Sequence, residues 1–158
     1  MIQIHACLPD DPLALPLLDR LSETLAAITG DSGRSSFDPH DLMLPKSLFV
    51  IARAADGVAV GCGAYRPLGD GIAEVKRMFA LPGTSGVGSA VLAYLERCAQ
   101  DDGYREIWLE TRRVNERAVR FYRRHGYREI ENYGRYIGRP EAICLAKPLA
   151  GQRRHPPG

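Results

Sequence analysis

The amino-acid sequence predicts an α/β domain in which a mixed, largely antiparallel sheet of six to seven strands carries helices on both faces. Two observations lead to this fold class. Asp56-Gly57 separates two apolar runs, which is a strong hairpin signal, and further along the chain strand-like runs alternate with helical stripes. The 158 residues suit a single domain over 1–150, with a flexible tail over 151–158.

The first half of the chain is predicted to contain four strands and one helix. Leu17, Leu21, Leu25 and Ile28 recur at helical spacing, and Gly30 suits the end of that helix. Asp31–Pro45 is polar and broken by glycine and proline, so we expect a loop with at most a short helical turn. The strands are expected over Ile2–Cys7, Ser47–Ala54, Val58–Tyr65 and Ala73–Ala80.

The second half predicts two helices and three strands. One helix carries an apolar stripe from Val87 to Cys98 and closes near Gly103. Asn115 is a good N-cap for the other, which turns Ala118, Phe121, Tyr122 and His125 inward and ends at Gly126. The strands are expected over Arg105–Glu110, Tyr127–Glu131 and Ala142–Lys147.

Composition excludes several classes of protein. The net charge of +2 argues against nucleic-acid binding. The four cysteines and four histidines are scattered, so no metal site is expected. The N-terminus resembles no signal peptide, and no run of apolar residues is long enough to cross a membrane. We therefore expect a cytoplasmic protein, monomeric or homodimeric, that binds neither nucleic acid nor a membrane.

A glycine-rich segment follows the third strand of the predicted hairpin set and leads into a helix. The free N–H groups and the dipole of a helix N-terminus bind phosphate, and glycine lets a ligand approach the backbone closely. A plain tight turn is the alternative. A Rossmann dinucleotide site fits less well, because Val91 replaces its third glycine and an antiparallel hairpin precedes it. The segment comprises Gly83, Thr84, Ser85, Gly86, Val87, Gly88, Ser89 and Ala90.

Two spaced motifs resemble those of the GCN5-related N-acetyltransferases (GNAT). That family has a loop of the form Q/R-x-x-G-x-G/A, followed by a helix with N-x-x-A-x-x-x-Y ahead of G-Y/F. The matching residues here are Gly86, Gly88, Asn115, Ala118, Tyr122, Gly126 and Tyr127. The resemblance implies the GNAT acyl-CoA acyltransferase fold and transfer of an acetyl group from acetyl-CoA to a primary amine, without a metal. Gly83 departs from the pattern, which puts a side-chain contact to the pyrophosphate in doubt.

The same resemblance implies where coenzyme A would bind. Backbone groups of Met78, Phe79 and Ala80 would pair with the pantetheine arm, and the loop from Gly83 to Ser89 would hold the pyrophosphate. Asn115, Ala118 and Tyr122 would lie beside the cofactor. The helix also carries arginines that are candidates for the adenosine phosphate, namely Arg117, Arg120, Arg123 and Arg124.

Three side chains are candidates for the chemistry. Tyr122 would donate a proton to the departing thiolate, because a phenol stays protonated at neutral pH. Glu74 and Glu110, on the strands flanking the cofactor, are candidates for the base, and Glu74 is preferred. Either could instead be a structural carboxylate paired with Lys76, Arg77 or Arg112. A backbone N–H near Met78 would polarise the thioester if a bulge leaves it unpaired.

The acceptor is not determined by the sequence. Asp31, Asp38 and Asp41 favour a cationic amine, whereas Arg135 and Arg139 favour a carboxylate, so these signals conflict. A small-molecule amine is the expected acceptor. Two alternatives remain open: a peptide or protein acetyltransferase acting on N-termini or lysines, and a non-catalytic acyl-CoA-binding regulatory module.

Overall fold

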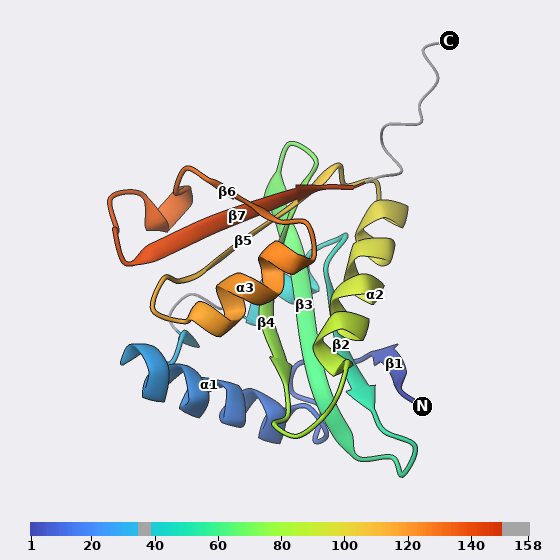
Figure 1. Ribbon diagram of the computed structural model, residues 1–158. Helices are drawn as coiled ribbons and strands as arrows, with labels where there is room; N and C mark the ends of the chain where they lie inside the picture. Colours follow the sequence, from blue (N-terminus) through green and yellow to red (C-terminus); the bar gives the residue numbers. More distant parts are fainter. Residues whose placement is uncertain (35–38, 150–158) are drawn as a thin grey trace.

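The computed structural model describes residues 1–34 and 39–149, and these form one seven-stranded sheet in the order β1-β2-β3-β4-β5-β7-β6 (Figure 1). All neighbouring strands are antiparallel except β4 and β5, which are parallel. The predicted fold class is confirmed. The strands are β1 (Gln3–Ala6), β2 (Leu48–Arg53), β3 (Ala59–Gly69), β4 (Ile72–Ala80), β5 (Glu106–Arg112), β6 (Arg128–Ile130) and β7 (Ala142–Pro148).

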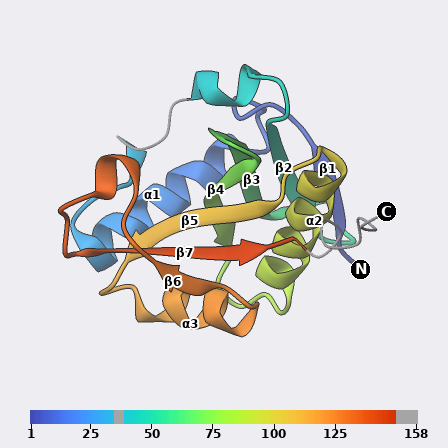
Figure 2. The ribbon, with the colours of Figure 1, turned by 90° about the horizontal axis from the view of Figure 1, so that it is seen from above.

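Helices cover both faces of the sheet (Figure 2). α1 (Leu15–Thr29) packs on one face through Leu17 and Leu18, against β2 and β3. α2 (Val87–Asp101) and α3 (Glu116–Arg124) lie on the other face, over the larger apolar core. The described residues also contain two 3-10 helices, η2 (Pro39–Met43) and η3 (Gly134–Tyr136). η2 is the short helical turn expected within 31–45, and the predicted tail 151–158 lies outside the described residues.

The helix ends follow the local signals in the sequence. The side chain of Asn115 accepts a hydrogen bond from the Ala118 N–H at 3.3 Å, as expected of an N-cap. Gly30 ends α1 in the left-handed conformation, with φ of 82°. α1 begins at Leu15, so Pro16 falls in its first turn, where its missing N–H costs nothing. β3 continues past the predicted Tyr65 to Gly69, because Pro67 sits beside a register shift.

The parallel pairing between β4 and β5 is short. Only three residue pairs are in register, ending at Glu74 with Trp108. Beyond that point β5 still pairs with β7 along its whole length, and β4 still pairs with β3. The two strands therefore separate from Val75 and Leu109 onward, which opens a gap in the middle of the sheet.

A β-bulge interrupts β4 beyond Glu74, in the part of the strand that no longer pairs with β5. Cys62 pairs with Phe79 but Ala64 pairs with Lys76, so one extra β4 residue is accommodated opposite Gly63. Arg77 takes up the bulge with φ of 58°, a left-handed conformation that is uncommon for a residue with a side chain. The role predicted for a backbone N–H near Met78, polarising the thioester, requires a bulge in this strand, and β4 contains such a bulge.

Glycines in β3 allow α2 to pack closely on the sheet. A Cβ atom on Gly63 would lie 2.9 Å from the side chains of both Val91 and Leu95, and 2.7 Å from the sulfur of Met78. Val91 and Leu95 are fully buried. The absence of a side chain at Gly63 thus sets how closely α2 approaches the bulged strand.

We expect Gly63→Ala to destabilise the fold by about 1–3 kcal/mol, because an extra methyl group in a filled core forces side chains off their rotamers. Urea unfolding at constant m-value measures the change. Val58→Ala is the control: Val58 is 52% exposed, and its truncation should change stability by about 0.5 kcal/mol or less. Equal stability of Gly63→Ala and wild type would show that α2 can shift at no cost.

Candidate functional site

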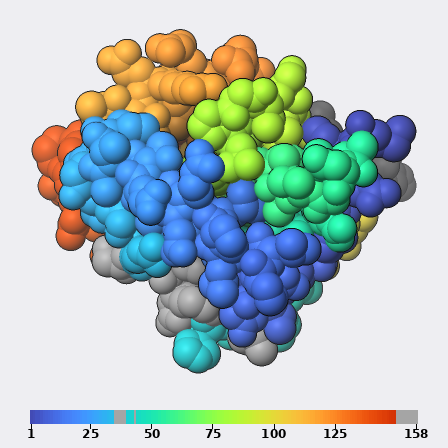
Figure 3. Space-filling model, turned by 90° about the horizontal axis from the view of Figure 1, so that it is seen from below, coloured from blue at the N-terminus to red at the C-terminus, as the bar shows by residue number. Residues whose placement is uncertain are grey.

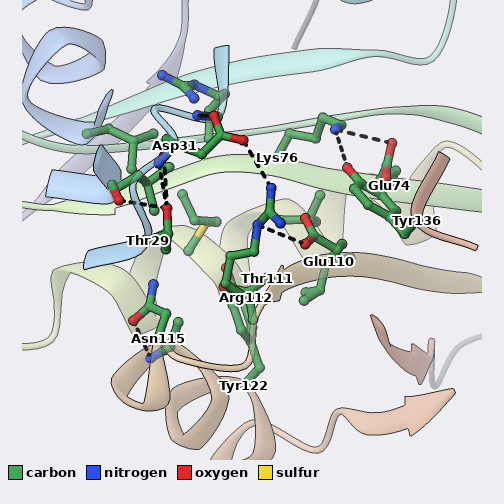
Figure 4. Close-up of a pocket in the computed structure, with 18 of the residues that line it drawn as sticks. Thr29, Asp31, Glu74, Lys76, Glu110, Thr111, Arg112, Asn115, Tyr122 and Tyr136 are labelled. Atoms are coloured by element: carbon green, nitrogen blue, oxygen red, sulfur yellow. Dashed lines mark hydrogen bonds and ion pairs between the residues drawn. The ribbon is translucent and has the colours of Figure 1, made fainter. Parts of the chain in front are cut away.

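A cavity of about 170 Å³ occupies the gap between β4 and β5 (Figure 4). Its walls come from α1, β4, β5, the start of α3 and the segment around η3. Several residues predicted from the sequence to take part in catalysis or acceptor binding line this cavity, together with Lys76 and Arg77. The lining includes Asp31, Glu74, Lys76, Arg77, Met78, Glu110, Arg112, Asn115, Ala118, Tyr122, Arg135, Tyr136 and Arg139.

The glycine-rich segment lies where β4 passes into α2, outside the cavity lining. Gly83 and Gly86 both have positive φ, at 83° and 75°, and Gly86 is the N-cap of α2. The first turn of α2 contains no acidic residue, so nothing there neutralises its free N–H groups. On the face drawn in Figure 3, the start of α2 (lime), α3 (orange) and α1 (blue) adjoin one another.

α3 supplies side chains to the start of α2. The Ser89 hydroxyl lies 3.0 Å from Nε2 of His125, a partner that sequence reasoning missed. The ring of Phe121 packs against Gly88, where an added Cβ would meet it at 3.4 Å. The guanidinium of Arg124 lies over that same ring, 5.9 Å from its centre. These contacts place one face of α3 beside the predicted phosphate loop.

Tyr122 lies between that loop and the cavity. Its side chain is 8% exposed, lines the cavity, and packs edge-to-face against Phe121 and Tyr127. Burial raises the pKa of Tyr122 well above its ordinary value. The phenol therefore stays protonated throughout the working pH range and remains a possible proton donor.

Glu110 is the cavity carboxylate with an unsatisfied oxygen. Among the described residues, its buried Oε2 has no hydrogen-bond partner, and the guanidinium of Arg112 is 3.9 Å away. Burial raises the pKa of Glu110, although the charges of Arg112 and Lys76 lower it in part. A carboxylate with a raised pKa and a free oxygen is well suited to accept a proton.

Both oxygens of Glu74 are occupied. Oε1 accepts hydrogen bonds at 2.9 Å from Arg66, and Oε2 accepts one at 2.6 Å from the hydroxyl of Tyr133. Lys76 lies 3.8 Å from Oε1, and Glu74 is only 2% exposed. Glu74 thus lines the cavity as a member of a buried polar network. This arrangement is close to the alternative in which Glu74 is a structural carboxylate paired with a cationic side chain.

Lys76 and Tyr136 form the wall next to Glu74. The ammonium of Lys76 donates a hydrogen bond at 3.3 Å to the Tyr136 hydroxyl, and burial lowers the pKa of Lys76. The sequence holds a signal for this residue: alternate residues of a strand share a face, so Glu74 and Lys76 point the same way, and the bulge at Arg77 breaks the alternation after them.

The acidic residues proposed to attract an amine are mostly paired already. Asp31 binds Arg112 at 3.0 Å, and Asp41 lies 3.6 Å from Arg66. Asp38 lies outside the described residues. By contrast, Arg135 and Arg139 both line the cavity and are exposed at its rim.

Two other features of the described residues bear on function. In the stretches 1–34 and 39–149, no cluster of three histidine, cysteine or acidic residues is arranged to hold a metal ion. Within the same stretches, no helix is both long and apolar enough to span a membrane.

Comparison with known proteins agrees with this geometry. The profile of the acetyltransferase (GNAT) family matches residues 18–127. An "IAA acetyltransferase" of Azospirillum brasilense is 29% identical over 144 residues, which cover 89% of this chain and 94% of that protein. A structure described as an acyl-CoA N-acyltransferase, from Klebsiella pneumoniae, is 26% identical with a TM-score of 0.79, covering 94% of this chain and 98% of the other.

A further structure shares the fold and contains coenzyme A. It is the PaiA N-acetyltransferase of Thermoplasma acidophilum in complex with coenzyme A, at 19% identity and a TM-score of 0.70 over 94% of this chain and 99% of the other. The family match covers more than half of the chain and includes the glycine-rich loop and α3. This chain belongs to the acetyltransferase (GNAT) family.

Proposed function

We propose that this protein transfers an acetyl group from acetyl-CoA to the primary amine of a small molecule, by direct attack of the amine on the thioester. One observation carries the proposal. A cavity between the separated strands β4 and β5, lined by Tyr122 and Glu110, lies next to an α2 N-terminus without acidic residues. A thioester held in the gap would have its phosphates at that N-terminus.

Coenzyme A would follow the open edge of β4. Its pantetheine arm would pair with backbone groups of Met78, Phe79 and Ala80, after the bulge. The pyrophosphate would meet the N–H groups of the loop from Gly83 to Ser89, and Arg124 would face the adenosine phosphate. Asn115 and Ala118 line the cavity beside Tyr122 and would border the arm. The coenzyme A complex of the Thermoplasma acidophilum protein supports this placement by its shared fold.

The chemistry needs three events, each with a candidate group. Glu110 takes a proton from the attacking ammonium, so the neutral amine nitrogen forms a bond to the thioester carbon. The N–H of Met78, at the bulge, stabilises the oxyanion of the tetrahedral intermediate. When the carbon–sulfur bond breaks, Tyr122 donates its proton to the thiolate, and the second proton lost by the nitrogen restores the phenol through solvent. Glu110 releases its proton to solvent, which leaves the amide and coenzyme A as products.

Glu110 is the better base in this arrangement, which reverses the preference drawn from the sequence. Glu74 has both oxygens in hydrogen bonds with Arg66 and Tyr133, so it would lose these bonds on accepting a proton. Glu110 keeps a buried oxygen without a hydrogen-bond partner among the described residues. The non-catalytic alternative is weakened, because a mere binding module has no need for an acid and a base in one cavity.

Acetyl-CoA should raise the thermal midpoint, and Gly88→Glu should abolish that rise. Saturation at a hundred times the dissociation constant stabilises a protein by about 2.7 kcal/mol. Glu adds a negative charge at the α2 N-terminus, where the pyrophosphate would bind. Gly88→Gln is the matched control, because it brings the same bulk against Phe121 without the charge, and it should retain part of the shift. An unchanged midpoint in the wild-type protein with acetyl-CoA would refute the placement.

Replacing Glu110 should mainly lower activity, whereas replacing Glu74 should mainly lower stability. Glu110→Gln should lower kcat/KM by about 10²–10⁴-fold, and leave stability unchanged or slightly higher because a buried charge is removed. Glu74→Gln should cost about 3 kcal/mol of stability, since it removes the buried carboxylate that binds Arg66 at 2.9 Å and leaves Asp41, at 3.6 Å, as the ionic partner of that guanidinium. Steady-state kinetics and urea unfolding of both variants measure this.

The pH profile provides a second readout. A raised pKa means that Glu110 loses its basic form at a higher pH than the usual carboxyl value of about 4.3. Wild-type kcat/KM should therefore fall on the acid side of neutrality, and Glu110→Gln should lack this limb. If Glu74→Gln removes the limb and folds normally, the sequence-based preference for Glu74 is restored.

Tyr122→Phe should lower kcat by about 10²–10⁴-fold and leave acetyl-CoA affinity nearly unchanged, because the ring and its packing remain. The raised pKa of Tyr122 implies that its ionisation causes no loss of activity at ordinary alkaline pH. Single-turnover thiol release measures the chemical step directly. Full activity of the variant in that assay would assign Tyr122 to packing and the proton to water.

A further inference from the structure

The cavity lining carries more cationic than anionic side chains. The described lining has five cationic side chains (Lys76, Arg77, Arg112, Arg135, Arg139) and three anionic ones (Asp31, Glu74, Glu110). All three acids have an ion-pair partner: Asp31 and Glu110 lie 3.0 Å and 3.9 Å from the guanidinium of Arg112, and Glu74 binds Arg66. An acceptor with several positive charges would therefore meet more repulsion than attraction.

Glu110 is the one described lining carboxylate with a buried oxygen that lacks a hydrogen-bond partner. An unsatisfied buried oxygen is costly, and an ammonium group is a donor that would satisfy it. The amine of the acceptor would thus lie at Glu110, beside the thioester. The remainder of the molecule would face the segment around η3.

Hydrogen bonds fix the backbone of that segment, which carries Arg135 and Arg139. The side-chain amide of Asn132 donates hydrogen bonds to the carbonyls of Tyr136 at 3.0 Å and Arg139 at 2.9 Å. The N–H of Arg139 donates to the Tyr136 carbonyl, and that of Ala142 donates to the Arg139 carbonyl. Because these bonds already order the backbone of the turn that carries Arg135 and Arg139, little backbone entropy is lost when a ligand binds there.

We infer that the acceptor is an amino acid or a similar small molecule that carries a carboxylate near its primary amine. Its ammonium group binds Glu110, and its carboxylate binds the guanidinium of Arg139, with Arg135 adding positive charge. No carboxylate among the described residues lies within ion-pair distance of Arg139, whereas a guanidinium fork matches a carboxylate in shape and charge. This inference rests on the proposed function of the same cavity.

The inference also resolves the conflict between the aspartates and arginines of the sequence. Asp31 and Asp41 are bound to arginines, so they offer little attraction to a cationic amine. The small volume, about 170 Å³, leaves room for a short acceptor beside the thioester and is below the usual range for drug-sized ligands. Asn132 acts as a positioning residue, because it fixes the backbone that carries Arg139.

The test measures thiol release from acetyl-CoA with matched acceptors: single amino acids, their carboxamides, and spermidine. The carboxamides keep the amine and nearly the same shape, and they replace the charged carboxylate with a neutral amide. Because this change also makes more of the amine neutral, it favours the carboxamide in any comparison that ignores binding of the carboxylate. We expect kcat/KM for the best amino acid to exceed that for its carboxamide by about tenfold or more. In Arg139→Gln this preference should disappear through a higher KM for the amino acid.

Two further variants separate binding from folding. Asn132→Ala should raise KM for the amino acid and leave KM for acetyl-CoA unchanged, while Arg128→Gln, an exposed arginine on β6, should change neither. Equal or faster reaction of the carboxamide or spermidine in the wild-type protein would overturn the acceptor class while the acetyl transfer stands. An absence of thiol release with every acceptor would overturn the proposed function and the acceptor class together.

Discussion

The early end of the β4–β5 pairing is the constraint on which the rest of the site depends. Parallel strands that stayed paired would close the sheet and leave no space between them; here only three residue pairs form. The bulge at Arg77 turns β4 at the open end of the gap. The guanidinium of Arg77 donates to the Ser22 hydroxyl at 2.8 Å and to the Leu18 carbonyl at 3.4 Å. The gap, the bulge and α1 are therefore held together as one unit.

A network of buried polar groups then fixes one side of the cavity, next to Glu74. Arg66, Glu74 and Tyr133 connect β3, β4 and the segment before η3, and burial beside Glu74 raises the pKa of Tyr133. A satisfied network of this kind stiffens the wall that it crosses. Glu110 stands outside that network, so its carboxylate is able to change its charge without breaking a wall of the site. The same fold thus holds both oxygens of one glutamate in hydrogen bonds and leaves an oxygen of the other without one.

Local signals accounted for most of the fold. The N-cap at Asn115, the C-cap at Gly30 and the Asp56-Gly57 turn each depend on neighbouring residues, and all three form as predicted. β3 runs beyond its predicted end at Tyr65 to Gly69, and a register shift next to Pro67 accommodates the proline in the strand. The placement of β7 between β5 and β6 depends on contacts between distant residues, which no local pattern encodes.

By itself, the sequence determined the order of elements, the glycine-rich entry to α2, and the presence of Tyr122, Glu74 and Glu110 on elements that flank the gap. Only the tertiary structure decided what each group is bonded to. Arg66 reaches Glu74 because antiparallel register sets the two residues opposite each other, while Arg112 leaves an oxygen of Glu110 without a hydrogen bond. The reason is physical: the basicity of a carboxylate depends on its burial and its partners, and residues distant in the chain supply both.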